Sequence, residues 1–353
     1  MAFRRIRWIT TVLLALMLLT CGSTAVAQSG SGFLPVREYE GAVYEARPPA
    51  DLTTVLLIGY DHRAEGQEEE LHGYSRGGQA DFLMLLVADH ENQVIRTLQF
   101  DRDTITGVKV TDFKGRQLEP RNIQICLAHA YGNTREKNNA NTIWSVENLM
   151  GIAARKDGAQ IDWYVAMDIS GISRLNDLLG GVTVTIPDDM TAFDPQMKKG
   201  ATLKLTGAQA EIFCRGRRGI GNQTNASRME RQRMYMDAAG ERLTAEIRKD
   251  AGFASELLTG MGVIYDAAVD SSNPFARQDA GTPTGEADGR YLMSSETVSG
   301  IVNLISRTIG YTRLPTETIP GRHVLADDGY IHFIPDEGAP LAWSIATFYR
   351  IKD

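Results

Sequence analysis

The sequence predicts a layered α/β domain, and two kinds of pattern lead to that prediction. Three apolar runs, at 55–59, 82–88 and 94–100, are continuous rather than alternating, which is typical of strands covered on both faces. Segments with apolar residues at helical spacing lie between and after these runs. Strands mixed with helices along one chain favour a layered α/β arrangement.

The later elements follow from apolar spacing and from turn residues. We first expect a helix with Ile143, Val146 and Met150 on one face, a helix over 172–179 that stops at Gly180-Gly181, and a strand over 182–186 ended by Pro187. A helix capped by Asn225 or Ser227 and running to about Lys249 follows, and then a loop over 269–290. The last expected elements are a helix with Val298, Ile301, Val302 and Ile305 on one face, strands near His323 and over 330–334, and a helix from about Ala339 to Tyr349. No boundary divides this part of the chain into two domains.

The bulk composition excludes several classes of protein. The 353 residues are 43% hydrophobic and 23% charged, an ordinary globular balance with enough chain for a large core. A net charge of -7 argues against a nucleic-acid partner, which would require a broad basic face. The histidines and cysteines have no zinc-ligand spacing, and neither a P-loop nor a G-x-S-x-G pattern occurs.

The N-terminus has the pattern of an export signal. Three arginines within the first seven residues precede an apolar stretch, and an A-x-A cleavage pattern ends at Ala27. The uncharged run is also just long enough to span a bilayer. We therefore expect residues 1–27 to be either a cleaved signal peptide or a retained membrane anchor. Cys126 and Cys214 follow in the exported part, where a disulfide could form, but we expect two buried free thiols.

The exported part begins with a spacer. Residues 28–50 are rich in glycine, serine and proline, which favours a linker. We expect residues 51–353 to form a single domain, with the motifs described below in 52–236 and further strands and helices in 237–353.

The local concentration of arginine is the strongest functional signal. Between Cys214 and Arg233 the chain has six arginines, no lysine and one acid. Guanidinium groups bind phosphate or carboxylate oxygens with paired hydrogen bonds, which predicts an anion-binding site. In extended backbone Arg215 and Arg217 would point the same way. One face of the following helix would carry donors at helical spacing: Arg228, Arg231, Gln232 and Tyr235. The alternative is a solvated helix face.

Charged residues also stand at the ends of the first three strands. Asp61 and Arg63 follow the first, Asp81 opens the second, and Arg102 and Asp103 close the third. If the second strand is antiparallel to the first, these residues meet at one sheet edge. Carboxylates gathered there would bind Mg²⁺, which prefers oxygen ligands and shares them with phosphates. The alternative is that the aspartates are turn and cap residues.

Taken together, these segments resemble the LytR-CpsA-Psr (LCP) family. The resemblance runs from about Leu52 to Met236, and more loosely to the end of the chain. It rests on the order and spacing of VLLIGYDHR, GGQADFLMLLVAD, TLQFDRDT, CLAHAYGN, SVENLMGI, IDWYVAMDISGISRLNDLLGGVTVTIPDDM, LTGAQAEIFCRGRR and SRMERQRMYM.

The resemblance implies a three-layer α/β/α sandwich around a central mixed sheet, with a lipid groove beside the head-group site. It implies an extracytoplasmic phosphotransferase, held at the membrane, that moves a glycopolymer such as teichoic acid or capsule polysaccharide from a polyprenyl-pyrophosphate carrier to peptidoglycan. It also implies Mg²⁺ on Asp61 and Asp81, and Asp103 as a proton acceptor or arginine-orienting acid. The residues implied for the pyrophosphate are Arg63, Arg102, Arg215, Arg217, Arg228, Arg231 and Gln232.

The chain departs from the family pattern at several positions. Gln79 and Ala80 stand where many members have arginine and serine, Asp101 where many have proline, and Asn225 where many have aspartate. Two other functions therefore stay open. The first is hydrolysis of the same pyrophosphate, and the second is non-catalytic, regulatory binding of polyprenyl phosphates or an anionic wall polymer.

Overall fold

The computed structural model describes residues 34–61, 78–112, 116–132, 135–153, 158–217, 219–266 and 289–352. Residues Pro35–Asp353 form one unit. The expected signal or anchor at 1–27 and most of the expected loop at 269–290 lie outside the described residues, so both stay predictions. Among the helices that are described, none combines the length and the apolar character needed to cross a bilayer.

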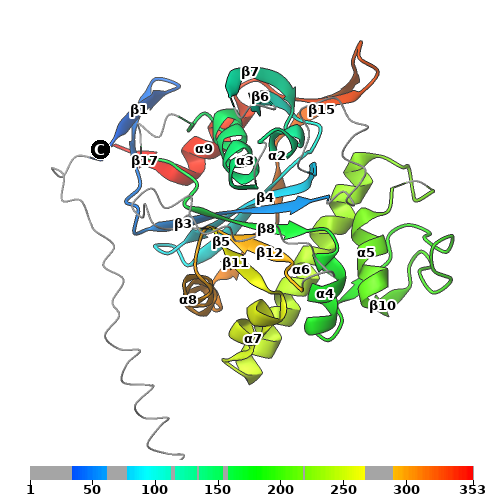
Figure 1. Cartoon of the computed structure of the whole chain (residues 1–353). Helices are drawn as coiled ribbons and strands as arrows, with labels where there is room; N and C mark the ends of the chain where they lie inside the picture. The colour runs from blue at the N-terminus through cyan, green and yellow to red at the C-terminus, as the bar shows by residue number, and fades with distance from the viewer. Residues whose placement is uncertain are drawn as a thin grey trace, which may run out of the picture. The chain divides into compact units, whose positions relative to one another are not determined.

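A mixed β-sheet occupies the centre of the described residues (Figure 1). Its order is β11 (Val263–Tyr265), β12 (Leu292–Ser294), β8 (Trp163–Asp168), β3 (Leu52–Tyr60), β4 (Ala80–Asp89), β5 (Val94–Phe100) and β13 (Thr312–Arg313), with β14 (Glu317–Thr318) also paired to β5. β4 is antiparallel to both β3 and β5, whereas β3 and β8 are parallel. The three predicted apolar runs form β3, β4 and β5, so these strands are confirmed.

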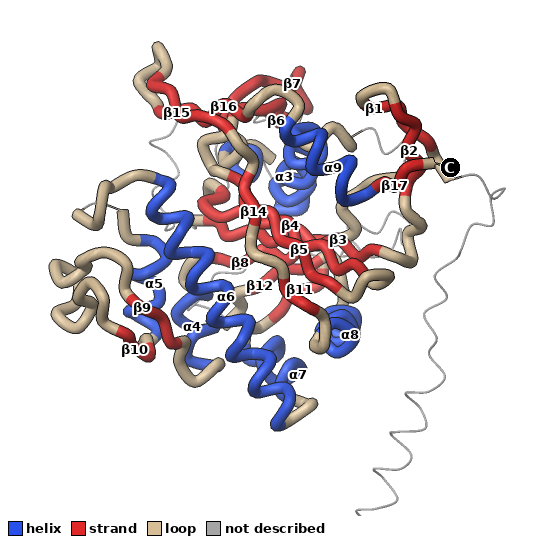
Figure 2. Tube along the Cα trace, turned by 180° about the vertical axis from the view of Figure 1, so that it is seen from behind, coloured by secondary structure: helices blue, strands red, loops and turns tan. Residues whose placement is uncertain are grey.

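Helices cover both faces of this sheet, which confirms the three-layer α/β/α sandwich (Figures 1 and 2). On one face lie α2 (Leu127–Ala130), α3 (Arg135–Leu149) and α9 (Ala339–Phe348), and on the other lie α4 (Gly171–Leu178), α6 (Asn225–Lys249), α7 (Phe253–Gly260) and α8 (Val298–Thr308), with α5 (Gly207–Arg215) against α4 and α6. Val146 of α3 and Trp343 of α9 join the core on the first face. Ile301 of α8 packs with Leu292 on the second.

Two helix ends show how local chemistry sets the boundaries. After α4, Gly180 and Gly181 adopt φ values of +71° and +91°, which favour glycine and stop the helix as predicted. The expected cap of α6, Asn225 or Ser227, was wrong, because the N-cap is Thr224. Thr224, whose backbone is extended, accepts the Ser227 N–H at 3.3 Å, while Asn225 is already helical.

Smaller sheets surround the sandwich. They comprise β1 (Val36–Tyr39) with β2 (Ala42–Ala46) and β17 (Tyr349–Ile351), β6 (Ile105–Thr111) with β7 (Gln117–Gln124), β9 (Thr183–Thr185) with β10 (Thr202–Lys204), and β15 (Gly321–Leu325) with β16 (Ile331–Pro335). The first of these differs from the linker expected at 28–50. Its backbone hydrogen bonds to the chain's last described residues, and not an apolar pattern, order the segment.

Candidate functional site

The charged ends of β3, β4 and β5 meet at one edge of the sheet, as the sequence predicted. Because neighbouring strands alternate in direction, Asp61, Asp81 and Arg102 are brought to that edge. The Asp61 N–H donates to the Gln79 carbonyl at 3.0 Å, which ties the end of β3 to the start of β4. A Cβ on Gly78 would lie 1.3 Å from the Asp61 carbonyl oxygen, so glycine is required for this close approach.

Asp81 is the shared partner of arginines from two distant segments. Its Oδ1 accepts a hydrogen bond from Arg102, and its Oδ2 accepts one from Nη1 of Arg228, on α6, at 3.3 Å. Arg228 is only 5% exposed, and among the described residues its Nε has no hydrogen-bond partner. Burial lowers the pKa of Arg228. The positive charges of Arg102 and Arg217 lower this pKa further, whereas the negative charge of Asp81 raises it. Buried like charges and an unused donor favour a bound anion.

Arg215 and Arg217 lie at the solvent-exposed rim of this site. Arg215 Nη2 is 3.4 Å from Asp61 Oδ1, and Arg217 donates from Nε to the Gln223 carbonyl at 3.3 Å. The prediction of extended backbone through both arginines was wrong, because Arg215 is the last residue of α5. We call Arg102, Arg215, Arg217 and Arg228 the arginine cluster. Arg63 lies outside the described residues, so its role stays a prediction.

Asp103 is a buried carboxyl group within reach of these charges. Its Oδ1 is 3.4 Å from Arg102 Nε and accepts a hydrogen bond from Gln124 Nε2 at 3.0 Å. Burial raises the pKa of Asp103, although Arg102, Arg217 and Arg228 act in the opposite direction. A carboxyl group with a raised pKa beside an anion site has the properties of a general base.

Arg231 does not join the arginine cluster, although the sequence analysis assigned it to the pyrophosphate. Its side chain is 1% exposed, and two of its three nitrogens donate to the protein's own backbone. Nε donates to the Phe213 carbonyl at 3.0 Å, Nη2 donates to the Gly216 carbonyl, and Nη1 is 3.5 Å from Asp188. Arg231 therefore holds the end of α5, and its assignment to the pyrophosphate stays a prediction.

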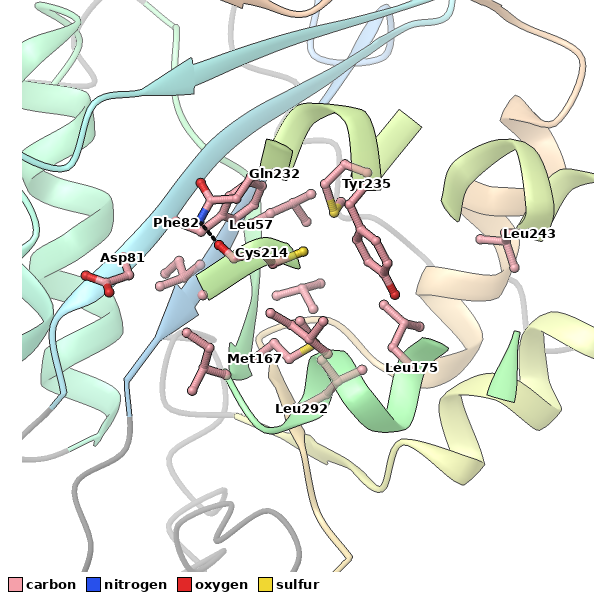
Figure 3. Close-up of a pocket in the computed structure, with 16 residues that line it drawn as sticks. Leu57, Asp81, Phe82, Met167, Leu175, Cys214, Gln232, Tyr235, Leu243 and Leu292 are labelled. Atoms are coloured by element: carbon pink, nitrogen blue, oxygen red, sulfur yellow. Dashed lines mark hydrogen bonds between the residues drawn. The ribbon is translucent and has the colours of Figure 1, made fainter. Parts of the chain in front are cut away.

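An apolar pocket of about 290 Å³ begins beside Asp81 (Figure 3). Figure 3 shows Asp81 at one end and Leu243 at the other, with Cys214 and Tyr235 between them. Gln232 also lines this pocket, and its Nε2 donates to the Cys214 carbonyl at 3.4 Å. Gln232 thus lies between the Asp81 end of the pocket and its apolar interior.

A second cavity, of about 270 Å³, adjoins the apolar pocket along the same face of the sheet. We call it the outer pocket. It shares four lining residues with the apolar pocket: Leu57, Leu175, Met236 and Leu243. The two cavities therefore adjoin beneath α6, and we call them together the apolar path, because most of their lining is apolar, although Asp237 and Arg313 also line the outer pocket.

Cys126 and Cys214 are buried and unpaired, as the sequence predicted. Burial raises the pKa of Cys126 to about 12, so its thiol remains protonated although Arg102 donates to Sγ at 3.3 Å. Burial raises the pKa of Cys214 as well. Neither is a thiolate nucleophile at neutral pH.

Asp101 and Asn225 belong to the site, although the sequence indicated Asp101 only as a departure from the family pattern and Asn225 as a departure or a helix cap. Asn225 Nδ2 donates to Asp101 Oδ1 at 2.8 Å, and its Oδ1 accepts from Arg228 Nη2 at 2.6 Å. On the far side, Asp101 Oδ2 is 2.8 Å from Nε2 of His323. The sequence held one signal for this contact. The chain has an extra acid at Asp101 and lacks the usual acid at Asn225, and such a paired gain and loss suggests that the two residues are neighbours.

No group of three or more histidine, cysteine or acidic side chains that could hold a metal ion occurs in the described part of the chain. The predicted pair, Asp61 and Asp81, supplies carboxylate oxygens at adjacent strand ends. One or two carboxylates are the protein ligands that Mg²⁺ usually takes, the rest being water and phosphate oxygens. The donor set therefore fits Mg²⁺, on condition that an arginine contact of Asp81 is exchanged.

Comparisons with known proteins agree with this geometry. A model described as the LytR_cpsA_psr family matches residues 37–247. The polyisoprenyl-teichoic acid–peptidoglycan teichoic acid transferase TagU of Halalkalibacterium halodurans is 28% identical over 221 residues, which cover 63% of this chain and 60% of that protein. The protein of the same name from Bacillus mycoides is 25% identical over 284 residues, 80% of this chain and 74% of the relative. The chain thus spans about 60% of the first relative's length.

Solved structures share the fold. TagV of B. subtilis superposes with a TM-score of 0.55 at 19% identity, covering 84% of this chain and 95% of that one. A structure of TagT bound to LI-WTA superposes with a TM-score of 0.56 at 16% identity, covering 86% and 92%. At these identities the likeness establishes the α/β/α architecture.

Proposed function

Since the chain belongs to the LytR_cpsA_psr family, we propose that it is a Mg²⁺-dependent phosphotransferase that moves a glycopolymer from a polyprenyl-pyrophosphate carrier to a cell-wall acceptor such as peptidoglycan. We propose that it acts on the extracytoplasmic side of the bacterial membrane, held by the N-terminal segment or released after Ala27. The glycopolymer class follows the relatives named for teichoic acid transfer.

One observation carries this proposal. The arginine cluster and the apolar pocket share Asp81, which bonds Arg102 and Arg228 on one side and lines the pocket on the other. A ligand that satisfies both must join an anionic head to a long apolar tail. A polyprenyl pyrophosphate has this structure, whereas a nucleotide or a free sugar would leave the apolar path unfilled.

The residues would act on the transfer as follows. The acceptor hydroxyl oxygen forms a bond to the glycan-bearing phosphorus, and the bond from that phosphorus to the bridging oxygen breaks. The lipid phosphate leaves with additional negative charge, which the buried Arg228 and the partly buried Arg102 stabilise from fixed positions. Asp103 takes the proton of the acceptor hydroxyl, a role that its raised pKa suits.

Mg²⁺ would be held by Asp61 and Asp81. When bound, it would neutralise phosphate charge between the two carboxylates. Arg102 and Arg228, whose guanidinium groups bond Asp81 in this structure, would donate to the phosphate oxygens.

The test has two stages. The full-length chain is purified from native membranes, and the bound lipid is identified by mass spectrometry. It is then incubated with a lipid-linked glycan and peptidoglycan fragments, with Mg²⁺ or with excess EDTA. We expect a glycan–peptidoglycan product that needs Mg²⁺ and disappears in Asp61→Asn.

The other outcomes contradict the proposal in distinct ways. Release of the glycan phosphate without a transfer product would identify a hydrolase. Bound polyprenyl phosphate with no turnover, and equal binding with and without Mg²⁺, would identify a regulatory binder. Replacement of both Arg215 and Arg217 by alanine should abolish head-group binding under each of these functions.

A further inference from the structure

A third cavity opens on the opposite side of Asp101 from the arginine cluster. It has a volume of about 300 Å³ and lies among the end of β5, the first turns of α6 and the hairpin β15–β16. We call it the His323 cavity. Its principal lining residues are Gln99, Asp101, Arg233, Ile319, His323 and Phe333. Apart from Asp101, which accepts a hydrogen bond from Asn225 beside the arginine cluster, none of them has a role in the proposed transfer.

A wall of two amides separates this cavity from the apolar pocket. Gln99 lines the His323 cavity and donates from Nε2 to Oε1 of Gln232, which lines the apolar pocket, at 3.2 Å. Gln99 Oε1 in turn accepts from Arg233 Nη1 at 2.8 Å. Both amides are buried, so the wall is fixed and the lipid path does not extend into the His323 cavity.

The cavity has an oriented polar group. Asp101 is 7% exposed, and its Oδ1 accepts from Asn225 Nδ2 and from the Asp103 N–H, both at 2.8 Å. Its Oδ2 holds His323 Nε2 at 2.8 Å, and the imidazole side chain is 38% exposed. A buried carboxylate fixes the orientation of the ring. Nδ1 makes no hydrogen bond to any described residue, so it is available to a ligand.

The lining selects the chemistry of the ligand. Asp101 disfavours a second phosphate, and the amide, imidazole and guanidinium groups disfavour a lipid tail. The lining combines these hydrogen-bonding groups with apolar side chains, because Ile319 and Phe333 also line the cavity and the Phe333 ring packs against the His323 imidazole, with their centroids 5.0 Å apart. A sugar ring has the matching character, with hydroxyl groups at its edge and C–H groups on its faces.

We propose that the His323 cavity is a saccharide subsite that holds a hydroxyl-bearing sugar ring next to the pyrophosphate site. The two sites are adjacent, because Asp101 directly precedes Arg102 and is linked through Asn225 to Arg228. The ring belongs either to the acceptor glycan or to the first sugar of the carrier-linked glycan. This inference rests on the proposed transferase function.

Three probes separate these sources from each other and from the proposed function. Calorimetry with the full-length chain measures binding of farnesyl pyrophosphate, of its N-acetylglucosaminyl ester, and of chitotetraose. Farnesyl pyrophosphate tests the head-group site alone. If the ring is the acceptor's, His323→Ala weakens chitotetraose binding about tenfold or more. If it is the donor's, the same change weakens binding of the sugar ester only. Farnesyl pyrophosphate binds equally in either case.

His332→Ala is the matched control, because His332 lies on the neighbouring strand β16 and bonds Asp328 outside the cavity. We expect wild-type binding of all three probes. Arg233→Gln provides a second variant, and in the wild-type chain the sugar probe should shift the imidazole NMR signals of His323 but not of His332. The proposed subsite is overturned if both sugar probes bind His323→Ala and Arg233→Gln as tightly as they bind the wild type. It is also overturned if the wild type binds neither sugar probe. If the wild-type chain does not bind farnesyl pyrophosphate, the proposed transferase function is contradicted instead.

Discussion

Asn225 connects two charged side chains of opposite sign. Its amide N–H donates to Asp101 while its amide oxygen accepts from Arg228. Only an amide can satisfy both neighbours, because a carboxylate has no proton to donate at neutral pH. The acid that the family pattern places at this position is replaced by an acid at 101, so the charge is retained nearby.

We predict that Asn225→Asp lowers the free energy of unfolding by about 2 kcal/mol, because two buried carboxylates would face each other across a 2.8 Å contact. The exchange Asp101→Asn with Asn225→Asp restores a donor and an acceptor, so it should recover at least half of the loss. Urea unfolding of the two variants measures this. Asn122→Asp on the exposed strand β7 is the control and should change stability by less than about 0.5 kcal/mol. Equal losses in the single and double variants would contradict a direct pairing.

Asp103 should give the site its pH dependence. Its pKa in the folded chain is raised above the usual 3.8, so the folded state keeps this proton to a higher pH than the unfolded state does. The free energy of unfolding therefore falls as pH rises from 3.8 through the raised pKa, and this fall should be absent in Asp103→Asn. Transfer activity should rise over the same interval, since only the ionised carboxylate accepts a proton.

Asp237→Asn is the matched control for this prediction. Burial raises the pKa of Asp237 too, but Asp237 lines the outer pocket, away from the arginine cluster. It should alter the pH dependence of stability and leave the acidic limb of the activity profile in place. An acidic limb that persists in Asp103→Asn would assign the proton transfer to another group.

At the scale of single elements, two of the arginines of α6, Arg228 and Arg231, make different contacts. Arg228 and Arg231 are three residues apart and share a face, as their spacing predicts. Arg228 lies in the first turn and bonds Asp81, whereas Arg231 lies one turn deeper and bonds the carbonyls that end α5. The spacing determines the face but not the depth of burial, so the sequence could not show that Arg231, unlike Arg228, donates to the backbone at the end of α5.

We predict that Arg231→Met and Arg228→Met separate stability from binding. Arg231→Met leaves two buried carbonyls without donors, which should lower the free energy of unfolding by about 3 kcal/mol. Arg228→Met removes a cation that repels its neighbours, so it should change stability less but weaken farnesyl pyrophosphate binding more than tenfold. Urea unfolding and calorimetry on both variants measure the two effects. The assignment fails if Arg231→Met binds more weakly than Arg228→Met while remaining as stable as the wild type.

The elements that the sequence predicted share a local cause. Buried runs such as 94–100 have the same apolar signal whatever they pair with, and β5 has these bounds. The hairpin β6–β7 lacked that signal, because β7 is polar, largely exposed and contains Pro120. Arg215 was misplaced because the prediction considered only extended backbone through Arg215 and Arg217. The capping box of Thr206 and Gln209 instead starts a helix that ends at Arg215.

At the scale of the whole molecule, the sandwich determines which strand ends meet and where the apolar path runs. Alternating strand directions were sufficient to predict that Asp61, Asp81 and Arg102 share an edge. The His323 cavity could not be predicted in this way, because β5, α6 and β15 are far apart in the sequence and carry no common motif. Its lining depends on how the C-terminal hairpin packs beside β5.

The apolar path beneath α6 leads to a prediction about lipid length. Ala239 lines the outer pocket but not the apolar pocket, so a tryptophan there should block the far part of the path and leave the part beside Asp81 open. Each isoprene unit that loses its place forfeits up to about 4 kcal/mol at roughly 0.8 kcal/mol per buried carbon. Ala239→Trp should therefore bind undecaprenyl pyrophosphate at least tenfold more weakly than the wild type and geranyl pyrophosphate equally well, measured by calorimetry in detergent. Ala245→Trp, on the exposed side of the same helix, should change neither affinity. If Ala239→Trp weakens both lipids alike, or neither, the tail does not follow this path.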